Sequence, residues 1–306
     1  MNLAPITFFV YKRVDHLIKT VAALKNNDLA TESELIIFSD GPKGKFDSDK
    51  VKEVREYIKK IDGFKRLQII EREKNFGLAN NIIEGVTEVV NNYGRIIVLE
   101  DDLVISPYFL RFMNSALNIY EKENRVISIH GYVYNIKGLP ETFFLRGADC
   151  WGWATWKRGW DLFEKDGEKL LTELKKKKLT REFDFNGGYP YTKMLEKHIK
   201  GKNDSWAIRW YASAFLKEML TLYPGKSYVQ HIGYDYNSSN ARFRTKFLDT
   251  EIKKDFTDIE KIEIKENIEA RRKIEKFLSN FTIRYRIEVI SNIISESLKR
   301  VVGWKK

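Results

Sequence analysis

The sequence predicts an α/β fold with a mostly parallel sheet flanked by helices, followed by a helical C-terminal extension. Over the first 130 residues, short apolar runs alternate with helix-spaced apolar residues, which is typical of βαβ units. Polar or acidic residues directly follow each of the first four runs. After about residue 247 the chain is strongly charged and its apolar spacing is helical.

Five apolar runs are expected to be strands, because strands buried in a parallel sheet have continuous apolar sequences. These runs are Ile6–Val10, Leu35–Phe38, Leu67–Ile70, Ile96–Leu99 and Val126–Ile129. Helical spacing of apolar residues follows the first four runs, over residues 14–24, 51–61, 82–90 and 109–117.

The pattern is less regular after residue 130. Residues 131–165 are rich in Gly, Trp and Phe, and residues 166–203 are charged and have the character of loops. A helix is expected from Trp206 to Leu222, ended by Pro224 and Gly225. We therefore expect a first domain over residues 1–247 and a charged helical extension over residues 248–306.

The composition is that of a soluble globular protein, with 43% hydrophobic and 32% charged residues. No apolar run approaches the roughly 20 residues that cross a bilayer. The apolar stretch Ile6–Val10 is short and precedes Lys12 and Arg13, the reverse of the order in a signal peptide. Cys150 is the single cysteine, so no internal disulfide is possible. These features favour the cytoplasm.

The net charge of +11 is unevenly distributed. Residues 271–306 contain ten Lys and Arg against three Glu, and the first 270 residues carry only +4. Because the larger part of the chain is nearly balanced, we expect no nucleic-acid partner.

In an open parallel sheet, ligands bind beyond the carboxyl ends of the strands. The sharpest signal there is Glu100-Asp101-Asp102 after the fourth run. Three adjacent carboxylates repel one another unless a cation lies among them, and a hard divalent ion held with substrate phosphates meets that need. A solvated acidic turn is the alternative. Neither G-x-G-x-x-G nor a P-loop is present, so a metal-bridged diphosphate is the remaining way to hold a nucleotide.

Four motifs in order resemble the GT-A glycosyltransferase superfamily. They are a loop after the first strand, Ser39-Asp40-Gly41, Arg72-x-x-Asn75-x-Gly77, and Val98 to Leu103 with a following Pro-x-Phe. The Glu-Asp-Asp form is similar to N-acetylglucosaminyltransferase I and to bacterial family-2-type transferases, whereas the usual Asp-x-Asp is absent. The resemblance covers about residues 4–240.

The resemblance implies a role for each matching residue. Asp102 would bind a divalent metal, Mn²⁺ or Mg²⁺, and His231 would complete that site. Asp204, in Asp204-Ser205-Trp206, would be the general base. The residues expected to bind the nucleotide-sugar are Tyr11, Arg13, Asp40 at the uracil or ribose, Arg72, Asn75, Asp101 near the ribose or sugar, and Glu100 in support.

Trp151, Trp153 and Trp206 are candidates for a platform that stacks on a sugar ring. Tryptophans at this density also pack well in a core, so both interpretations remain open.

The C-terminal segment has helix-spaced Ile and Val from Ile283 to Val301, surrounded by Lys and Arg. It is typical of a basic amphipathic helix that lies on an anionic membrane. A helix packed on protein is the alternative. The protein would accordingly be cytoplasmic, or peripheral on the inner face of the membrane.

The expected activity is transfer of a hexosyl or N-acetylhexosaminyl group from a UDP-sugar to a hydroxyl of a glycan or lipid-linked glycan, with inversion. Such a reaction belongs to polysaccharide biosynthesis. A sugar-nucleotide pyrophosphorylase is the leading alternative, although its Gly-rich first loop is absent here. A non-catalytic carbohydrate-binding or membrane-peripheral protein is a second alternative.

Overall fold

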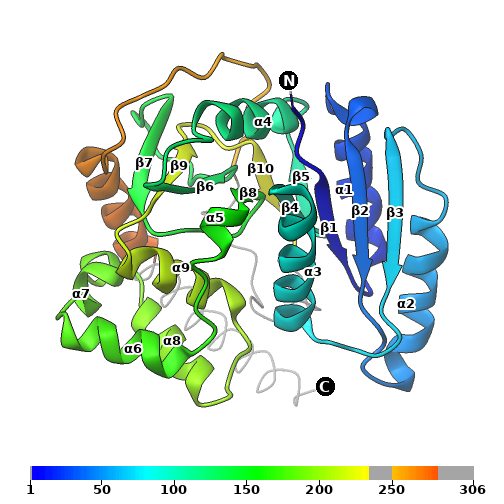
Figure 1. Cartoon of the computed structure of the whole chain (residues 1–306), viewed down its shortest axis with the longest axis horizontal. Coiled ribbons are helices and arrows are strands. Elements are labelled where there is room, and N and C mark those ends of the chain that lie inside the picture. The colour runs from blue at the N-terminus through cyan, green and yellow to red at the C-terminus, as the bar shows by residue number, and fades with distance from the viewer. Residues whose placement is uncertain (1, 234–249, 282–306) are drawn as a thin grey trace, which may run out of the picture.

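Eight strands form one sheet in the order β3-β2-β1-β4-β8-β6-β9-β7 (Figure 1). The computed structural model describes residues 2–233 and 250–281. The strands are β1 (Ile6–Val10), β2 (Glu34–Ser39), β3 (Arg66–Glu71), β4 (Arg95–Glu100), β6 (Val126–His130), β7 (Thr142–Arg146), β8 (Trp153–Trp156) and β9 (Leu220–Pro224). All five expected strands are therefore confirmed.

The first four strands are parallel and in register. Val10 pairs with Ser39, Ser39 pairs with Glu71, and Phe9 pairs with Glu100. The carboxyl ends of β1 to β4 consequently lie along one edge of the sheet, which we call the carboxyl edge.

The other half of the sheet is mixed. Strand β8 lies between β4 and β6 and is antiparallel to both. Strand β9 is parallel to β6, and β7 is antiparallel to β9 at the outer edge. The sheet is thus mostly parallel, as expected, but the fifth predicted strand, β6, is separated from β4 by a strand that the sequence pattern did not indicate.

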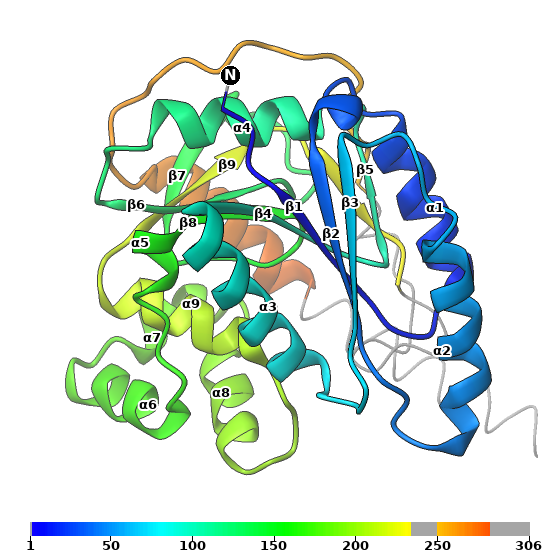
Figure 2. The same cartoon turned by 45° about the vertical axis from the view of Figure 1, so that its right-hand side comes forward.

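Helices cover both faces of the sheet. Because neighbouring residues of a strand point to opposite faces, Phe8 packs with α1, α2 and α4, whereas Phe9 packs with α3. Figure 2 shows α3 in front of the sheet, with α1 and α2 to the right. The bounds are α1 (Val14–Lys25), α2 (Lys45–Ile58), α3 (Leu78–Tyr93), α4 (Phe109–Ile119) and α5 (Lys157–Trp160). The three-layer arrangement agrees with the predicted fold class.

Residues 166–203 are largely helical, which corrects the expected loop. They form α6 (Gly167–Lys176), α7 (Thr180–Phe183) and α8 (Tyr191–Ile199). Leu170, Leu174 and Leu195 of these helices are buried in a hydrophobic cluster with α9 (Trp206–Leu216) and β7. Packing against α9 stabilises these helices, although their local sequence pattern is not typical of helices.

The expected helix Trp206–Leu222 is shorter than predicted. Helix α9 ends at Leu216, Glu218 adopts a left-handed φ of 56°, and the chain then enters β9. Leu220 and Leu222 pair with β6 and β7, so sheet pairing overrides helical spacing there.

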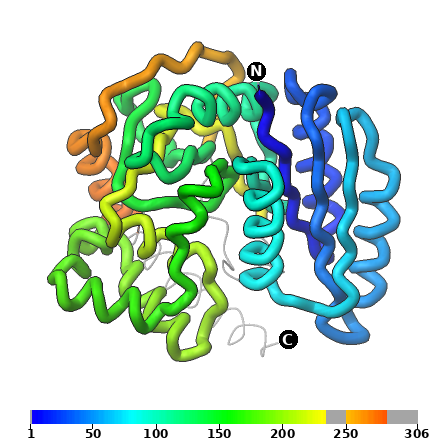
Figure 3. The backbone as a smooth tube through the Cα atoms, in the orientation of Figure 1, coloured from blue at the N-terminus to red at the C-terminus, as the bar shows by residue number. Residues whose placement is uncertain are grey.

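The described part of the extension packs on the main domain. Residues 250–266 contain no helix, contrary to expectation, and their path is the orange segment at the top of Figure 3. A helix begins at residue 268 and continues to residue 281, and it buries Ala270, Ile274 and Leu278 beside β7 and α9. The predicted basic helix from Ile283 to Val301 lies outside the described residues, and the domain boundary at residue 247 stays a prediction. Among the described helices none has the length and apolarity to span a bilayer.

A second, two-stranded sheet continues from the carboxyl edge. Strand β5 (Leu103–Ile105) pairs antiparallel with β10 (Val229–His231), and His231 lies opposite Leu103. This pairing brings His231 next to the acidic triplet that follows β4.

Candidate active site

Glu100, Asp101 and Asp102 lie at the carboxyl end of β4, and Arg13 binds the two aspartates from one side. Arg13 Nη2 donates to Asp101 Oδ1 at 2.5 Å and to Asp102 Oδ2 at 2.7 Å. The Thr20 hydroxyl on α1 donates to the Asp101 carbonyl oxygen at 2.9 Å. Both aspartates are more than 90% buried, so Arg13 neutralises charge that water screens poorly.

One arginine does not balance three acids. Burial raises the pKa of Glu100 to about 8, and the charges of Asp102 and Asp101 add to the rise. Burial also raises the pKa of Asp101 to about 6, although Arg13 opposes this effect. The raised pKa values reflect an excess of negative charge that a bound cation would relieve.

His231 is the second side chain at Asp102. Its Nε2 lies 3.5 Å from Asp102 Oδ2, and the backbone N–H of Ile232 donates to the Asp102 carbonyl at 2.9 Å. Burial lowers the pKa of His231, which favours the neutral form that can bind a metal. A β-carbon at Gly233 would stand 2.3 Å from Asp102 Oδ2, so the chain passes too close for any other residue.

The donor set fits a divalent metal bound partly by substrate. In the described ranges, no three His, Cys, Asp or Glu side chains make up a metal site by themselves. Asp102 Oδ2 and His231 Nε2 lie close enough together to bind one metal ion. Phosphate oxygens of the substrate commonly complete the coordination shell of Mg²⁺ in such sites. The roles of Asp102 and His231 as ligands stay predictions that this geometry supports.

Asp40, at the end of β2, organises the neighbouring loop. Its carboxylate accepts hydrogen bonds from the backbone N–H groups of Gly41 and Phe76 at 2.8 Å and of Gly77 at 3.0 Å. The Asn75 amide adds another at 3.1 Å. These bonds fix the turn that leads into α3. A contact between Asp40 and a nucleobase or ribose stays a prediction.

Arg72 and Tyr11 are positioned by other neighbours at the same edge. The Arg72 guanidinium lies 4.7 Å from the centre of the Phe76 ring, and its Nε donates to Asn81 at 3.3 Å. The Tyr11 hydroxyl donates to Asp47 at 2.8 Å, and burial raises the pKa of Tyr11 to about 12.

Asp204 is exposed and directly precedes α9. Its side chain is 61% exposed, and one oxygen lies 3.9 Å from an Arg209 nitrogen. The other oxygen is 3.9 Å from where a β-carbon on Gly77 would stand, which places Asp204 beside the Asp40 loop. Ser205, not Asp204, caps the helix by accepting from the Ile208 N–H at 3.2 Å. The carboxylate of Asp204 is therefore not used as the helix cap.

The three candidate platform tryptophans have different positions. Trp153 is fully buried and Trp206 is 3% exposed, with ring centres 5.5 Å apart in the core beside Trp160 and Trp210. Neither has a ring face for a sugar, which corrects that part of the platform. Trp151 is partly exposed and stacks on His231 with ring centres 4.7 Å apart. Only Trp151 of the three adjoins the acidic site.

The model of the family described as Glycosyl transferase family 2 matches residues 7–183, more than half of the chain. The chain belongs to glycosyl transferase family 2. The matched region contains β1 to β4 and the acidic triplet, whereas Asp204 and His231 follow it.

Solved structures show only distant likeness to this family 2 chain. The mannosyltransferase PcManGT from Pyrobaculum calidifontis, solved with GDP-Man and Mn²⁺, is 10% identical over 43% of this chain and 36% of its own, with a TM-score of 0.30. TarS from S. aureus is 17% identical over 47% of this chain and 24% of its own, with a TM-score of 0.29. Its 1–349 fragment is 13% identical over 74% and 59%, with a TM-score of 0.37.

The chain thus spans less than two thirds of each of these solved chains. No curated protein matches it. The similarity to N-acetylglucosaminyltransferase I stays a prediction.

Sequence reasoning missed several residues of this family 2 site. Thr20 is a buried polar residue on the apolar face of α1. A polar residue at such a position in the sequence could have indicated a contact with the site. Asp47 bonds both Tyr11 and Lys12, and nothing in the local pattern indicates it. Gly233 follows the predicted ligand His231 by two residues, but its close approach to Asp102 is visible only in the fold.

Proposed function

We propose that the chain transfers a sugar from a nucleotide-sugar to a hydroxyl of a glycan or lipid-linked glycan, with inversion and with help from a divalent metal. The observation that carries the proposal is the pair Asp102–His231 beside the acids Glu100 and Asp101, at the carboxyl edge of parallel strands in a family 2 chain. A UDP-sugar carrying a hexosyl or N-acetylhexosaminyl group is the proposed donor.

The donor would lie along the carboxyl edge. Asp102 and His231 would hold Mn²⁺ or Mg²⁺, which when bound supplies positive charge for the departing diphosphate. Arg13 and Arg72 would contact phosphate or ribose, and Asn75 and Tyr11 would line the nucleotide. Asp40 orders the loop that contains Phe76 and Gly77, and this loop leads from the carboxyl edge into α3.

The acceptor would approach from the side of Asp204 and Trp151. Asp204 would take the proton of the acceptor hydroxyl while that oxygen bonds to the anomeric carbon. The bond from the anomeric carbon to the diphosphate breaks on the opposite face, which gives inversion. The exposed carboxylate of Asp204 and the accessible part of Trp151 support these roles.

Two features bear on the alternatives. The segment after β1, Tyr11-Lys12-Arg13-Val14, lacks the glycines that a pyrophosphorylase loop needs for a triphosphate, and family 2 membership favours glycosyl transfer. One structural neighbour was solved with GDP-Man, so GDP-sugars belong in the same donor screen as UDP-sugars.

The test is Asp102→Ala, with Asp15→Ala as a control at an exposed acid in the first turn of α1. We expect Asp102→Ala to abolish transfer and to remove the Mn²⁺-dependent part of nucleotide binding in calorimetry, while the protein still folds. Asp15→Ala should bind and turn over like the wild type. Equal UDP affinity of Asp102→Ala and wild type in Mn²⁺ contradicts the metal site.

A screen of nucleotide-sugars by thermal stabilisation, with and without Mn²⁺, identifies the donor before these variants are assayed. If the purified wild type neither transfers nor hydrolyses any donor, the non-catalytic alternative is correct instead.

A further inference from the structure

Arg13 binds the same carboxylate oxygen that a metal would need. Asp102 Oδ2 accepts from Arg13 Nη2 at 2.7 Å and faces His231 Nε2 at 3.5 Å. The same Arg13 nitrogen also bonds Asp101 Oδ1. One guanidinium nitrogen therefore bridges two acids of the triplet, next to the nitrogen that would share the metal with Asp102.

A divalent ion on Asp102 Oδ2 and this arrangement of Arg13 disfavour each other. A hard cation binds a carboxylate oxygen at about 2.0–2.6 Å, so a metal on Asp102 Oδ2 lies within about 5 Å of Arg13 Nη2. Like charges at this distance repel strongly in a site that water screens poorly. The Asp102 and His231 side chains are only 12% and 13% exposed, so screening by water is weak there.

Helix α1 holds the backbone of Arg13 in place, whereas the partly exposed Arg13 side chain can move away from the acids. Arg13 precedes the first turn of α1, and α1 is tied to the triplet by the hydrogen bond from Thr20 to Asp101. The Arg13 side chain is 25% exposed, which is more than that of either acid it bonds. It starts at the carboxyl edge, where a donor diphosphate would lie, and a guanidinium suits phosphate oxygens.

We propose that Arg13 competes with the divalent metal for Asp102 and transfers its hydrogen bonds to the donor diphosphate when metal and nucleotide bind together. This inference rests on the proposed function. It makes metal and nucleotide binding cooperative, because the metal displaces Arg13 from the acids and the diphosphate gives the displaced guanidinium new acceptors.

The experiment measures Mn²⁺ affinity by calorimetry for wild type, Arg13→Gln and Lys12→Gln, each without nucleotide and with saturating UDP or GDP. Lys12→Gln is the matched control, because it removes one positive charge from the adjacent residue, which pairs with Asp47 at 2.8 Å rather than with the triplet. Arg13→Lys is the second variant in case Arg13→Gln does not fold, since it keeps the charge but loses the planar fork.

We expect Arg13→Gln to bind Mn²⁺ without nucleotide at least about fivefold more tightly than wild type, since loss of a competing ion pair of this kind has an effect of that order. The factor by which nucleotide tightens Mn²⁺ binding should fall at least about fivefold in the same variant. Lys12→Gln should leave both quantities within about twofold. Arg13→Lys should lie between wild type and Arg13→Gln.

Unchanged Mn²⁺ affinity in Arg13→Gln without nucleotide overturns the competition, even if UDP then binds more weakly. An equal change in Lys12→Gln overturns it as well, because net charge alone would then explain the result. If wild type with nucleotide and Arg13→Gln both fail to bind Mn²⁺, the metal site itself is wrong and the proposed function fails first.

Discussion

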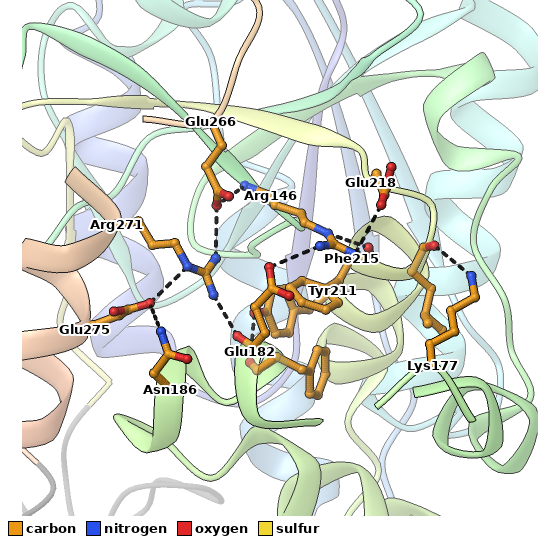
Figure 4. A network of polar contacts seen from close by, with 12 residues as sticks. Arg146, Lys177, Glu182, Asn186, Tyr211, Phe215, Glu218, Glu266, Arg271 and Glu275 are labelled. Atoms are coloured by element: carbon orange, nitrogen blue, oxygen red, sulfur yellow. Dashed lines mark hydrogen bonds and ion pairs between the residues drawn. The ribbon is translucent and has the colours of Figure 1, made fainter. Parts of the chain in front are cut away.

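Two clusters of buried charge lie in different halves of the molecule and are built differently. At the carboxyl edge, Asp101 and Asp102 of the acidic triplet share Arg13. The second cluster joins the helix that begins at residue 268 to β7 and α7, and it contains Arg146, Arg271, Glu182, Glu266 and Glu275 (Figure 4).

In the second cluster each arginine is matched by acids and carbonyls. Arg271 bonds Glu266 at 2.9 Å, Glu275 at 3.0 Å and the Glu182 carbonyl at 2.7 Å. Arg146 bonds Glu182 at 3.1 Å and the Phe215 carbonyl at 2.9 Å. Buried charges that are paired and hydrogen-bonded can be structural, whereas excess charge of one sign in a buried position marks a place for a ligand. From this contrast we predict a role in stability for the second cluster and a role in ligand binding for the first.

Outside the proposed metal site, the largest expected effect on activity comes from Asp204→Asn. Loss of the base should lower kcat by about 10²–10⁴ while donor binding and melting temperature stay near wild type. Ser205→Ala is the matched control, because Ser205 caps α9 through Ile208. It should lower stability by about 0.5–2 kcal/mol and spare kcat. If Asp204→Asn turns over within a few-fold of wild type, Asp184 and Asp235 become the next candidates, and Asp235 lies outside the described residues.

Arg271→Ala should have the opposite effect, on stability rather than on chemistry. Its side chain is almost fully buried, and its removal leaves Glu266 and Glu275 without their main partner. Breaking such a pair costs about 3–5 kcal/mol of unfolding free energy, whereas kcat of the folded protein should not change. Denaturant unfolding measures the first quantity and an activity assay measures the second.

The control for Arg271 is Lys273→Ala, which removes a partly exposed pair with Glu269 on the same helix and a hydrogen bond to the Gly138 carbonyl oxygen. That change should cost less than about 1 kcal/mol. A loss of kcat in Arg271→Ala, or equal destabilisation by the two variants, contradicts the structural role of the second cluster.

Truncation after residue 281 should have the smallest effect on stability and activity of the changes considered. Residues 282–306 carry six Lys and Arg against two Glu, so their loss should weaken binding to anionic vesicles in a salt-dependent way and leave the melting temperature unchanged. Truncation after residue 267 should instead expose the cluster that Ala270, Ile274 and Leu278 fill, and give an aggregating protein. Vesicle binding that persists without residues 282–306 contradicts the membrane role.

Local patterns in the sequence account for the first half of the fold and for the identity of the acids. Continuous apolar runs such as Ile6–Val10 and Ile96–Leu99 are strands because their side chains are buried on both faces. The position of Glu100-Asp101-Asp102 follows directly, since polar residues after parallel strands meet at one edge. Both conclusions require only the spacing of apolar residues along the sequence and the common direction of the parallel strands.

Only the tertiary structure decided which residues that lie far apart in the sequence contact one another in the fold. Trp151 and Trp153 are two residues apart and chemically identical, yet one adjoins His231 and the other fills the core. Leu220 to Pro224 reads as the end of a helix but pairs between two strands. His231 and Arg13 lie 218 residues apart in the sequence, and both lie next to Asp102. The sequence determined strands β1 to β4 and β6 and the acidic triplet, because those depend on neighbouring residues. Partners distant in sequence were decided by the packing of the whole sheet, whose free energy no local pattern contains.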